Sequence, residues 1–287
     1  MNPRKALRAL VEQSRYTIIP GAFDALSARL AQLAGFDAVY LTGGGYSRAC
    51  GFPDIGLLTL TENLAFANRC VEAVDIPVIA DADNGYGNAT NVIRTVREFE
   101  KTGVAGFHLE DQVSPKKCGH YEGKGVIKAE EMVGKIKAAV DTRRDGDMLV
   151  IARTDARAVE GFQAAVDRVN AYLEAGADVG FVEAPETADE VASLPRLVTK
   201  PLVINMFHGG KTPSIPAREL ERMGYRLGIY PSQSHRAAIR AVQEVLQVLK
   251  EDGDTIRIED RLASFKDRER VVNATWWSDR ERRYLAD

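Results

Sequence analysis

The feature that most constrains the fold of this 287-residue chain is a short apolar run that recurs eight times. Each run is rich in Val, Ile and Phe, ends in polar or acidic residues and is followed by a stretch with helical apolar spacing. The eight runs span residues 17–24, 37–45, 77–85, 104–112, 148–156, 178–186, 201–209 and 225–233.

This alternation of strand and helix predicts a parallel sheet covered by helices, because parallel strands need crossover connections. Eight repeats predict an α/β fold closed into a (β/α)8 TIM-type barrel, with residues 1–287 forming a single domain. A doubly wound open sheet is the alternative, but its nucleotide fingerprint GxGxxG is missing after the first run.

Past residue 233 the pattern changes, and residues 234–287 are expected to form extra C-terminal helices that extend the same domain. Trp276 and Trp277 stand beside a charged tail and are too large to be left singly in water. Either they pack on the barrel or the tail docks on a second subunit.

Composition excludes several classes of protein. The net charge of −3 lacks the basic excess of a dedicated nucleic-acid binder. The sequence contains no stretch of about 18 apolar residues, so we expect no membrane span. The start of the chain lacks the apolar region of a secretory signal. The three cysteines are few and odd in number, so they do not form a disulfide framework. This cysteine usage favours a reducing cytoplasm.

The predicted strand ends are unusually polar, and function gathers at the carboxyl ends of barrel strands. Asp81 and Asp83 follow the third run, and strand alternation predicts that they face the same side. Glu110 follows the neighbouring run. Three carboxylates this close repel one another unless a cation lies between them, and hard oxygen ligands suit Mg²⁺, with Mn²⁺ as a substitute. A helix cap would be the better explanation of a single such residue, whereas three acids on adjacent strands favour the metal.

The loop after Glu110 is long, polar and rich in Gly, and it contains Cys118. Such a loop can close over a site. Lys116, Lys117 and His120 are expected to lower the pKa of the Cys118 thiol or to orient an anionic substrate beside it. The thiol is then a candidate acid, base or nucleophile; the alternative is an exposed cysteine without a chemical role.

Several segments together resemble the isocitrate lyase/phosphoenolpyruvate mutase superfamily, from about residue 16 to the end. They are PGAFDALSA, YLTGGG, GFPDIGLLT, PVIADADNGYGN, GFHLEDQVSPKKCGH, IARTDA, FVEAP and NMFHGGKTP. The resemblance implies a Mg²⁺-dependent barrel, with Asp83 as the direct ligand and Asp81 and Glu110 acting through waters. It also implies a homotetramer, built from dimers that exchange C-terminal helices.

The same resemblance implies roles for further residues. Cys118 would protonate the enolate left by cleavage, Tyr40 matches a proposed base, and Arg153 would clamp a carboxylate. The backbone amides of Thr42, Gly43 and Gly44 would hold the carboxylate of the pyruvate half. The remaining substrate-pocket positions are Asp54, Lys116, Gly119, His120, Glu183, Asn205 and Arg236.

The KKCGH segment is typical of the carbon–carbon lyases in this superfamily, so we expect a lyase that cleaves a 2-alkylmalate-type acid, such as 2,3-dimethylmalate, to pyruvate and a carboxylic acid. 2-Methylisocitrate cleavage is an alternative. The resemblance places an Arg of those enzymes, which contacts the third carboxylate of the substrate, near the position of Phe265, and Phe cannot make that contact. Phosphonate chemistry of the carboxyphosphonoenolpyruvate or phosphoenolpyruvate mutase type and a non-catalytic dicarboxylate-binding barrel are further alternatives.

Overall fold

In the computed structural model, which describes residues 2–285, eight parallel strands close into a barrel in the order of the sequence. Each strand lies inside one of the eight predicted runs, so the predicted (β/α)8 fold is confirmed. The strands are β1 Thr17–Ala22, β2 Val39–Leu41, β3 Val78–Asp81, β4 Gly106–Glu110, β5 Leu149–Thr154, β6 Val179–Val182, β7 Leu202–Asn205 and β8 Leu227–Tyr230.

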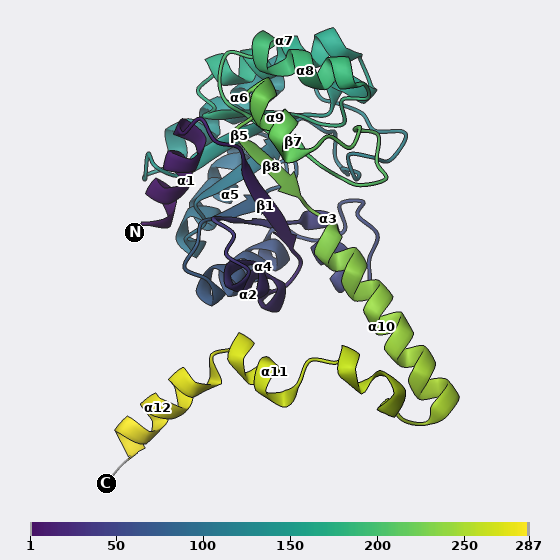
Figure 1. Cartoon of the computed structure of the whole chain (residues 1–287). Coiled ribbons are helices and arrows are strands. Elements are labelled where there is room, and N and C mark those ends of the chain that lie inside the picture. The colour runs from purple at the N-terminus through teal and green to yellow at the C-terminus, as the bar shows by residue number, and fades with distance from the viewer. Residues whose placement is uncertain (1, 286–287) are drawn as a thin grey trace.

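Helices surround the barrel and connect its strands (Figure 1). Those up to the last strand are α1 Pro3–Glu12, α2 Ala25–Leu33, α3 Gly43–Ala49, α4 Leu60–Ala73, α5 Ala89–Thr102, α6 Ala129–Thr142, α7 Phe162–Glu174, α8 Ala188–Leu197 and α9 Ala217–Met223, with a short 3-10 helix at Ala156–Ala158. After β8 come α10 Gln233–Asp252, a 3-10 helix at Ile256–Arg261, α11 Phe265–Val271 and α12 Ala274–Leu285.

Local sequence signals set the helix boundaries. Capping boxes start α2 at Asp24 and α4 at Thr59, where the side chain of each capping residue accepts a backbone N–H of the first turn. Gly103 ends α5 in the left-handed conformation, with a φ of 87°, which costs glycine little. These short-range signals explain why the strand–helix alternation could be read from the sequence.

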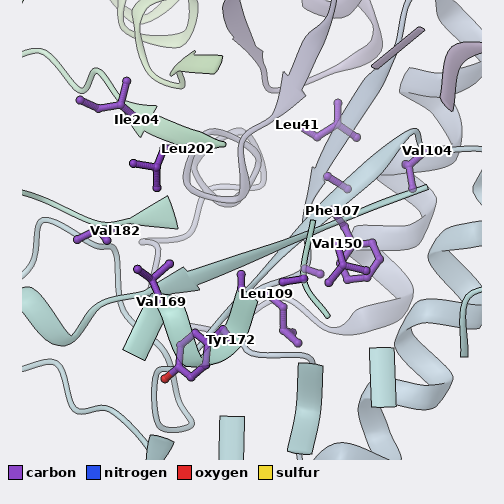
Figure 2. Packing of buried hydrophobic residues seen from close by; sticks show 14 of the residues in the cluster. Leu41, Val104, Phe107, Leu109, Val150, Val169, Tyr172, Val182, Leu202 and Ile204 are labelled. Atoms are coloured by element: carbon purple, nitrogen blue, oxygen red, sulfur yellow. The ribbon is translucent and has the colours of Figure 1, made fainter. Parts of the chain in front are cut away.

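Apolar side chains form two concentric layers. One fills the barrel interior and includes Ile79, Ile151 and Phe181. The other lies between the strands and the helices, where Phe107 and Tyr172 are fully buried (Figure 2). Because each strand is buried on both faces, its sequence is nearly continuously apolar until it reaches the polar end.

Helix α1 closes the amino-terminal end of the barrel. Its Leu7 and Val11 belong to the interior apolar cluster, and a Cβ added to Gly106 at the start of β4 would lie 3.2 Å from the Leu7 side chain. The opposite end of the barrel is therefore the open one, and it is the end where the polar residues gather.

The C-terminal helices leave the barrel. Helix α10 extends away from it, and α11 and α12 continue past it (Figure 1). Arg29 of α2 donates a hydrogen bond to the carbonyl of Val271, 2.6 Å away. Trp276 and Trp277 are 39% and 66% exposed, and the helix α12 that carries them lies apart from the barrel (Figure 1), so they do not pack on the barrel of their own chain. Within residues 2–285 the helices include none that is both long and apolar enough to cross a membrane.

Candidate active site

A cavity of about 200 Å³ opens at the carboxyl ends of the strands. The loop of residues 113–125, called the Cys118 loop below, contributes part of its wall. An antiparallel bridge between Gln112 and Val126 closes the base of this loop. Thirteen of the residues predicted from the sequence line the cavity: Tyr40, Thr42, Gly44, Asp54, Asp81, Lys116, Cys118, Gly119, His120, Arg153, Glu183, Asn205 and Arg236.

The two aspartates of the third strand end lie in different backbone conformations. Asp81 is the last residue of β3, and its Oδ1 accepts the N–H of Asp83 at 3.0 Å. Asp83 has a φ of 47°, in the left-handed region. Strand alternation therefore stops at Asp81. The prediction that alternation turns both side chains to the same side was wrong, because Asp83 lies outside the strand. Only Asp81 lines the cavity.

Lys116 lies against these acids. Its Nζ is 2.6 Å from Asp83 Oδ1 and 2.7 Å from Asp54 Oδ1, and all three side chains are buried. Burial opposes the ammonium charge, but the surrounding carboxylates outweigh it and raise the pKa of Lys116 well above its usual value. Burial raises the pKa of Asp83 to about 6. The ammonium of Lys116 is thus a cation shared by two carboxylates.

Glu110 is paired with Arg153 and does not line the cavity. The Nε atom of Arg153 is 3.3 Å from Glu110 Oε2, and its Nη2 is 3.2 Å from Glu183 Oε2. Two hydrogen bonds of 2.9 and 3.1 Å also join Arg153 to Asp155. Two donors of Arg153 therefore hold a carboxylate of the chain itself, and its role toward a substrate carboxylate stays a prediction.

The carboxylates suit a divalent cation in their chemistry. Glu110 Oε1 is buried and has no hydrogen-bond partner, whereas the buried Asp83 Oδ1 is paired with the Lys116 ammonium. Both are hard oxygen donors of the kind that Mg²⁺ prefers. Within residues 2–285, however, no three His, Cys, Asp or Glu side chains are arranged to hold a metal ion as they stand. Lys116 and Arg153 supply the positive charge there instead.

The Cys118 loop is docked over the cavity. Cys118 N–H donates to the carbonyl of Asp54 at 3.0 Å, and the His120 ring stacks on Phe207 with centroids 4.5 Å apart. A Cβ on Gly119 would lie 2.6 Å from Arg153 Nη2, so only glycine allows this approach.

The expected lowering of the Cys118 pKa was wrong. Burial, followed by the charge of Asp54, raises it to about 11. The Lys116 ammonium is paired with the carboxylates of Asp54 and Asp83 rather than with the sulfur. The thiol is therefore protonated at neutral pH, which suits a proton donor rather than a nucleophile.

Tyr40 is buried and hydrogen-bonded. Its hydroxyl lies 2.7 Å from His108 Nε2 and 3.3 Å from Asp81 Oδ2. Burial raises its pKa well above the usual value, whereas Arg153 and Lys116 act in the opposite direction. Burial also lowers the pKa of His108 to about 4, so this ring is neutral at neutral pH. His108 was not predicted, although a histidine inside an apolar strand was a signal for it.

The glycine-rich segment begins α3. The Thr42 side chain caps that helix by accepting the N–H of Gly45 at 3.1 Å, and the Thr42 N–H donates to the carbonyl of Ala22. The prediction that the Thr42 amide is available to substrate was therefore wrong. Gly43 lies against Asp81, outside the lining of the main cavity. The amides of Gly43 and Gly44 lie in the first turn, where a helix offers them no acceptor.

The far side of the cavity combines amide, acid and cation. Asn205 Nδ2 lies 3.2 Å from Glu183 Oε1, and Arg236 donates to the carbonyl of His208 at 2.7 Å. Phe265 is 72% exposed at the start of α11 and does not line the cavity. Residues that line it but were not among the predicted site residues include Arg48, Phe207, Pro231, His235 and Ile239.

Sequence comparison places this geometry in a known family. The family model of phosphoenolpyruvate phosphomutase matches residues 7–250. The chain belongs to this family. It is 48% identical over 268 residues to 2,3-dimethylmalate lyase of Eubacterium barkeri, covering 93% of each chain. It is 45% identical over 260 residues to 2-methylisocitrate lyase of Aeropyrum pernix, covering 91% of this chain and 84% of that one.

A mutase is also among the relatives of this family member. The chain is 44% identical over 280 residues to the chloroplastic carboxyvinyl-carboxyphosphonate phosphorylmutase of Arabidopsis thaliana, covering 96% of this chain and 83% of that one.

Solved structures agree with the family assignment. A crystal structure of 2,3-dimethylmalate lyase, a member of the PEP mutase/isocitrate lyase superfamily, matches with a TM-score of 0.93 and 37% identity, covering 99% and 96% of the two chains. Phosphonopyruvate hydrolase in complex with oxalate and Mg²⁺ matches with a TM-score of 0.91 and 32% identity, covering 99% and 100%. The predicted superfamily is confirmed, and the lyase names among the relatives support the predicted carbon–carbon lyase.

Proposed function

We propose that this chain is a Mg²⁺-dependent carbon–carbon lyase that cleaves a 2-alkylmalate-type acid, such as 2,3-dimethylmalate, to pyruvate and a carboxylic acid. The observation that carries the proposal is the protonated Cys118 thiol, held on a loop docked against the strand-end cavity. The 48% identity to a 2,3-dimethylmalate lyase supports the choice of substrate class.

The residues fit a retro-aldol type of cleavage. The 2-hydroxyl proton leaves as the C2–O bond becomes the carbonyl of pyruvate, and the electron pair of the C2–C3 bond moves to C3. The Cys118 S–H then donates its proton to the resulting enolate. Tyr40 is our candidate for accepting the hydroxyl proton. Burial raises its pKa well above the usual value, and the positive charges of Arg153 and Lys116 oppose that rise.

Charged and polar groups around the cavity fit a dicarboxylate. We propose that the amides of Gly43 and Gly44 receive the carboxylate of the pyruvate half, and that Arg236 receives the other carboxylate. The remaining members of the proposed substrate pocket are Thr42 (through its side chain), Asp54, Lys116, Gly119, His120, Arg153, Glu183 and Asn205.

We propose that Asp81, Asp83 and Glu110 hold the metal ion, Mg²⁺ or Mn²⁺ in its place. When bound, the ion supplies Lewis-acid stabilisation of negative charge on the 2-oxo acid half of the substrate. Support comes from the buried, unpartnered Glu110 Oε1 and from the Mg²⁺ complex of the related phosphonopyruvate hydrolase.

We also propose a homotetramer of helix-swapped dimers that works in the cytoplasm. The exposed apolar side chains of α10 and the exposed Trp277 support assembly. The free thiols of all three cysteines support a reducing compartment.

The test is a pyruvate-coupled assay on malate, 2-methylmalate, 2,3-dimethylmalate, 2-methylisocitrate and oxaloacetate. We expect pyruvate from 2,3-dimethylmalate, its loss with EDTA and its return with Mg²⁺. Cys118→Ser should lower kcat by about 10²-fold or more, because general acid catalysis contributes on that scale. Cys50→Ser removes an exposed thiol outside the cavity and is the matched control.

Other results would redirect the assignment. Preferred turnover of 2-methylisocitrate would show that a third carboxylate is accommodated despite Phe265. New phosphonate signals in ³¹P NMR would establish mutase chemistry, and oxalate binding with no turnover of any substrate would establish a binding barrel. A Cys118→Ser variant as fast as the parent would remove the proposed acid.

A further inference from the structure

The side chain of Lys124, at the far end of the Cys118 loop, is buried although it is charged. It is only 1% exposed, and its Nζ lies 2.9 Å from Asp155 Oδ1. The same Nζ donates a hydrogen bond to the carbonyl of Gly119 within the loop. One ammonium thus joins two points of the loop to the barrel, since Asp155 directly follows β5.

Asp155 connects this ammonium to Arg153. Its carboxylate is fully buried and accepts two hydrogen bonds from the Arg153 guanidinium. Its own backbone N–H donates to Asp111 Oδ1 at 2.9 Å, which fixes the main chain at this point. The carboxylate therefore lies between one cation of the barrel and one cation of the loop. A buried carboxylate in this position is stabilised by both.

The loop backbone next to Cys118 depends on the same contacts. Gly119 packs against Arg153 and Glu183 closely enough that an added Cβ would lie 2.6 Å from each side chain. Cys118 precedes Gly119, so a displacement of Gly119 also displaces the thiol.

We propose that Lys124 is a positioning residue that holds the Cys118 loop against the barrel and, through Asp155, holds Arg153 in its place beside Glu183. The role of Cys118 as an acid rests on the proposed function. The role of Lys124 in holding the loop does not depend on that function. Loss of this contact releases the loop while the barrel stays folded.

An exposed ion pair of the same loop serves as a control. Lys211 Nζ lies 2.7 Å from Glu122 Oε1, but the Glu122 side chain is 85% exposed. Solvent screens such a pair, and its loss changes little. Lys124→Met and Lys211→Met each remove an ammonium that pairs the Cys118 loop with another segment. The Lys124 pair is buried on both sides, whereas the Lys211 pair is exposed at Glu122.

The experiment measures how fast iodoacetamide alkylates Cys118 without substrate, in the full chain carrying Cys50→Ser, by mass spectrometry of the Cys118 peptide. Lys124→Met should raise the rate by about tenfold or more, because removing one partner of a buried pair is strongly unfavourable. Lys211→Met should change it less than about threefold. Lys124→Arg keeps the charge and should restore most of the protection.

Cys70 reports on global unfolding in the same samples, because it is fully buried in the core. Fast Cys118 labelling with a protected Cys70 identifies local release of the loop. If Lys124→Met also exposes Cys70, Asp155→Asn decides, since it weakens the same contact from the barrel side and should likewise speed Cys118 labelling. Labelling at the parent rate in the folded variant, or an equal effect of Lys211→Met, would overturn the proposal.

Turnover gives a second readout. In the lyase assay Lys124→Met should lower kcat more than it raises KM, because the thiol and Arg153 lose their positions while Arg236 and the glycine amides remain. A parent chain that releases no pyruvate would refute the proposed function, whereas the alkylation rates would still report on Lys124.

Discussion

At the scale of single residues, the candidate site is governed by buried charges that neutralise one another. Arg153 lies within 3.3 Å of three carboxylates, those of Asp155, Glu183 and Glu110. Such groups are costly to bury alone and become tolerable only when each has a partner. Cys118 has no cationic partner of this kind, and burial therefore determines its protonation state.

This difference predicts the pH dependence of Cys118 reactivity. Because its pKa is raised to about 11, the thiol stays protonated at pH values where an ordinary cysteine ionises. In the Cys50→Ser chain, alkylation of Cys118 should accelerate steadily with pH up to about 11. Rates measured from pH 7 upward check this, and a plateau reached below pH 9 would contradict it.

At the scale of the elements, parallel strands that end at one rim account for the gathering of polar residues. Asp81, Arg153 and Asn205 come from three different strands but meet at one cavity, because every strand runs in the same direction. Close contacts between adjacent strands maintain this closed arrangement. The join of β1 and β8 is one example: a Cβ on Gly21 would lie 2.4 Å from the carbonyl oxygen of Pro231.

Two glycine substitutions test this packing. Gly21→Ala places a methyl group against backbone and should destabilise the fold by about 1–3 kcal/mol. Gly134→Ala lies in the interior of α6 with open space around it and should stabilise by about 0.5–1 kcal/mol, since alanine favours helix. Denaturant unfolding of both variants measures the free energies; a harmless Gly21→Ala would show that the β1–β8 join can relax.

At the scale of the whole molecule, the chain leaves apolar surface exposed on the helices beyond the barrel. Val242 and Leu246 of α10 are 56% and 59% exposed, and Trp277 is 66% exposed. An apolar stripe of this length is a common mark of an interface. It is the surface on which our proposed helix-swapped assembly depends.

We therefore expect Leu246→Asp to dissociate the assembly, because a carboxylate on the apolar stripe would be buried without a partner. Gln247→Asp introduces the same charge on the neighbouring exposed position of α10, and should leave the mass unchanged. Light scattering after size exclusion measures the mass of each. A parent chain that runs as a monomer at micromolar concentration would contradict the proposed tetramer.

The barrel could be predicted because its signals are local. Apolar runs of strand length, helix caps such as Asp24 and glycines such as Gly103 each act within a few residues, and their repetition indicated the fold. The polar strand ends also indicated which residues would meet, because parallel strands share one rim. Asp81, Cys118, Arg153 and Glu183 line the cavity as expected.

The features of the site that local sequence patterns could not predict depend on burial and on contacts between distant parts of the chain. The lysines beside Cys118 predicted a lowered pKa, but the folded loop turns Lys116 toward Asp54, 62 positions away, and buries the sulfur. Lys124 meets Asp155 across 31 positions. Neither pairing has a sequence signature, because desolvation and charge pairing arise only when the loop and the barrel come together in three dimensions.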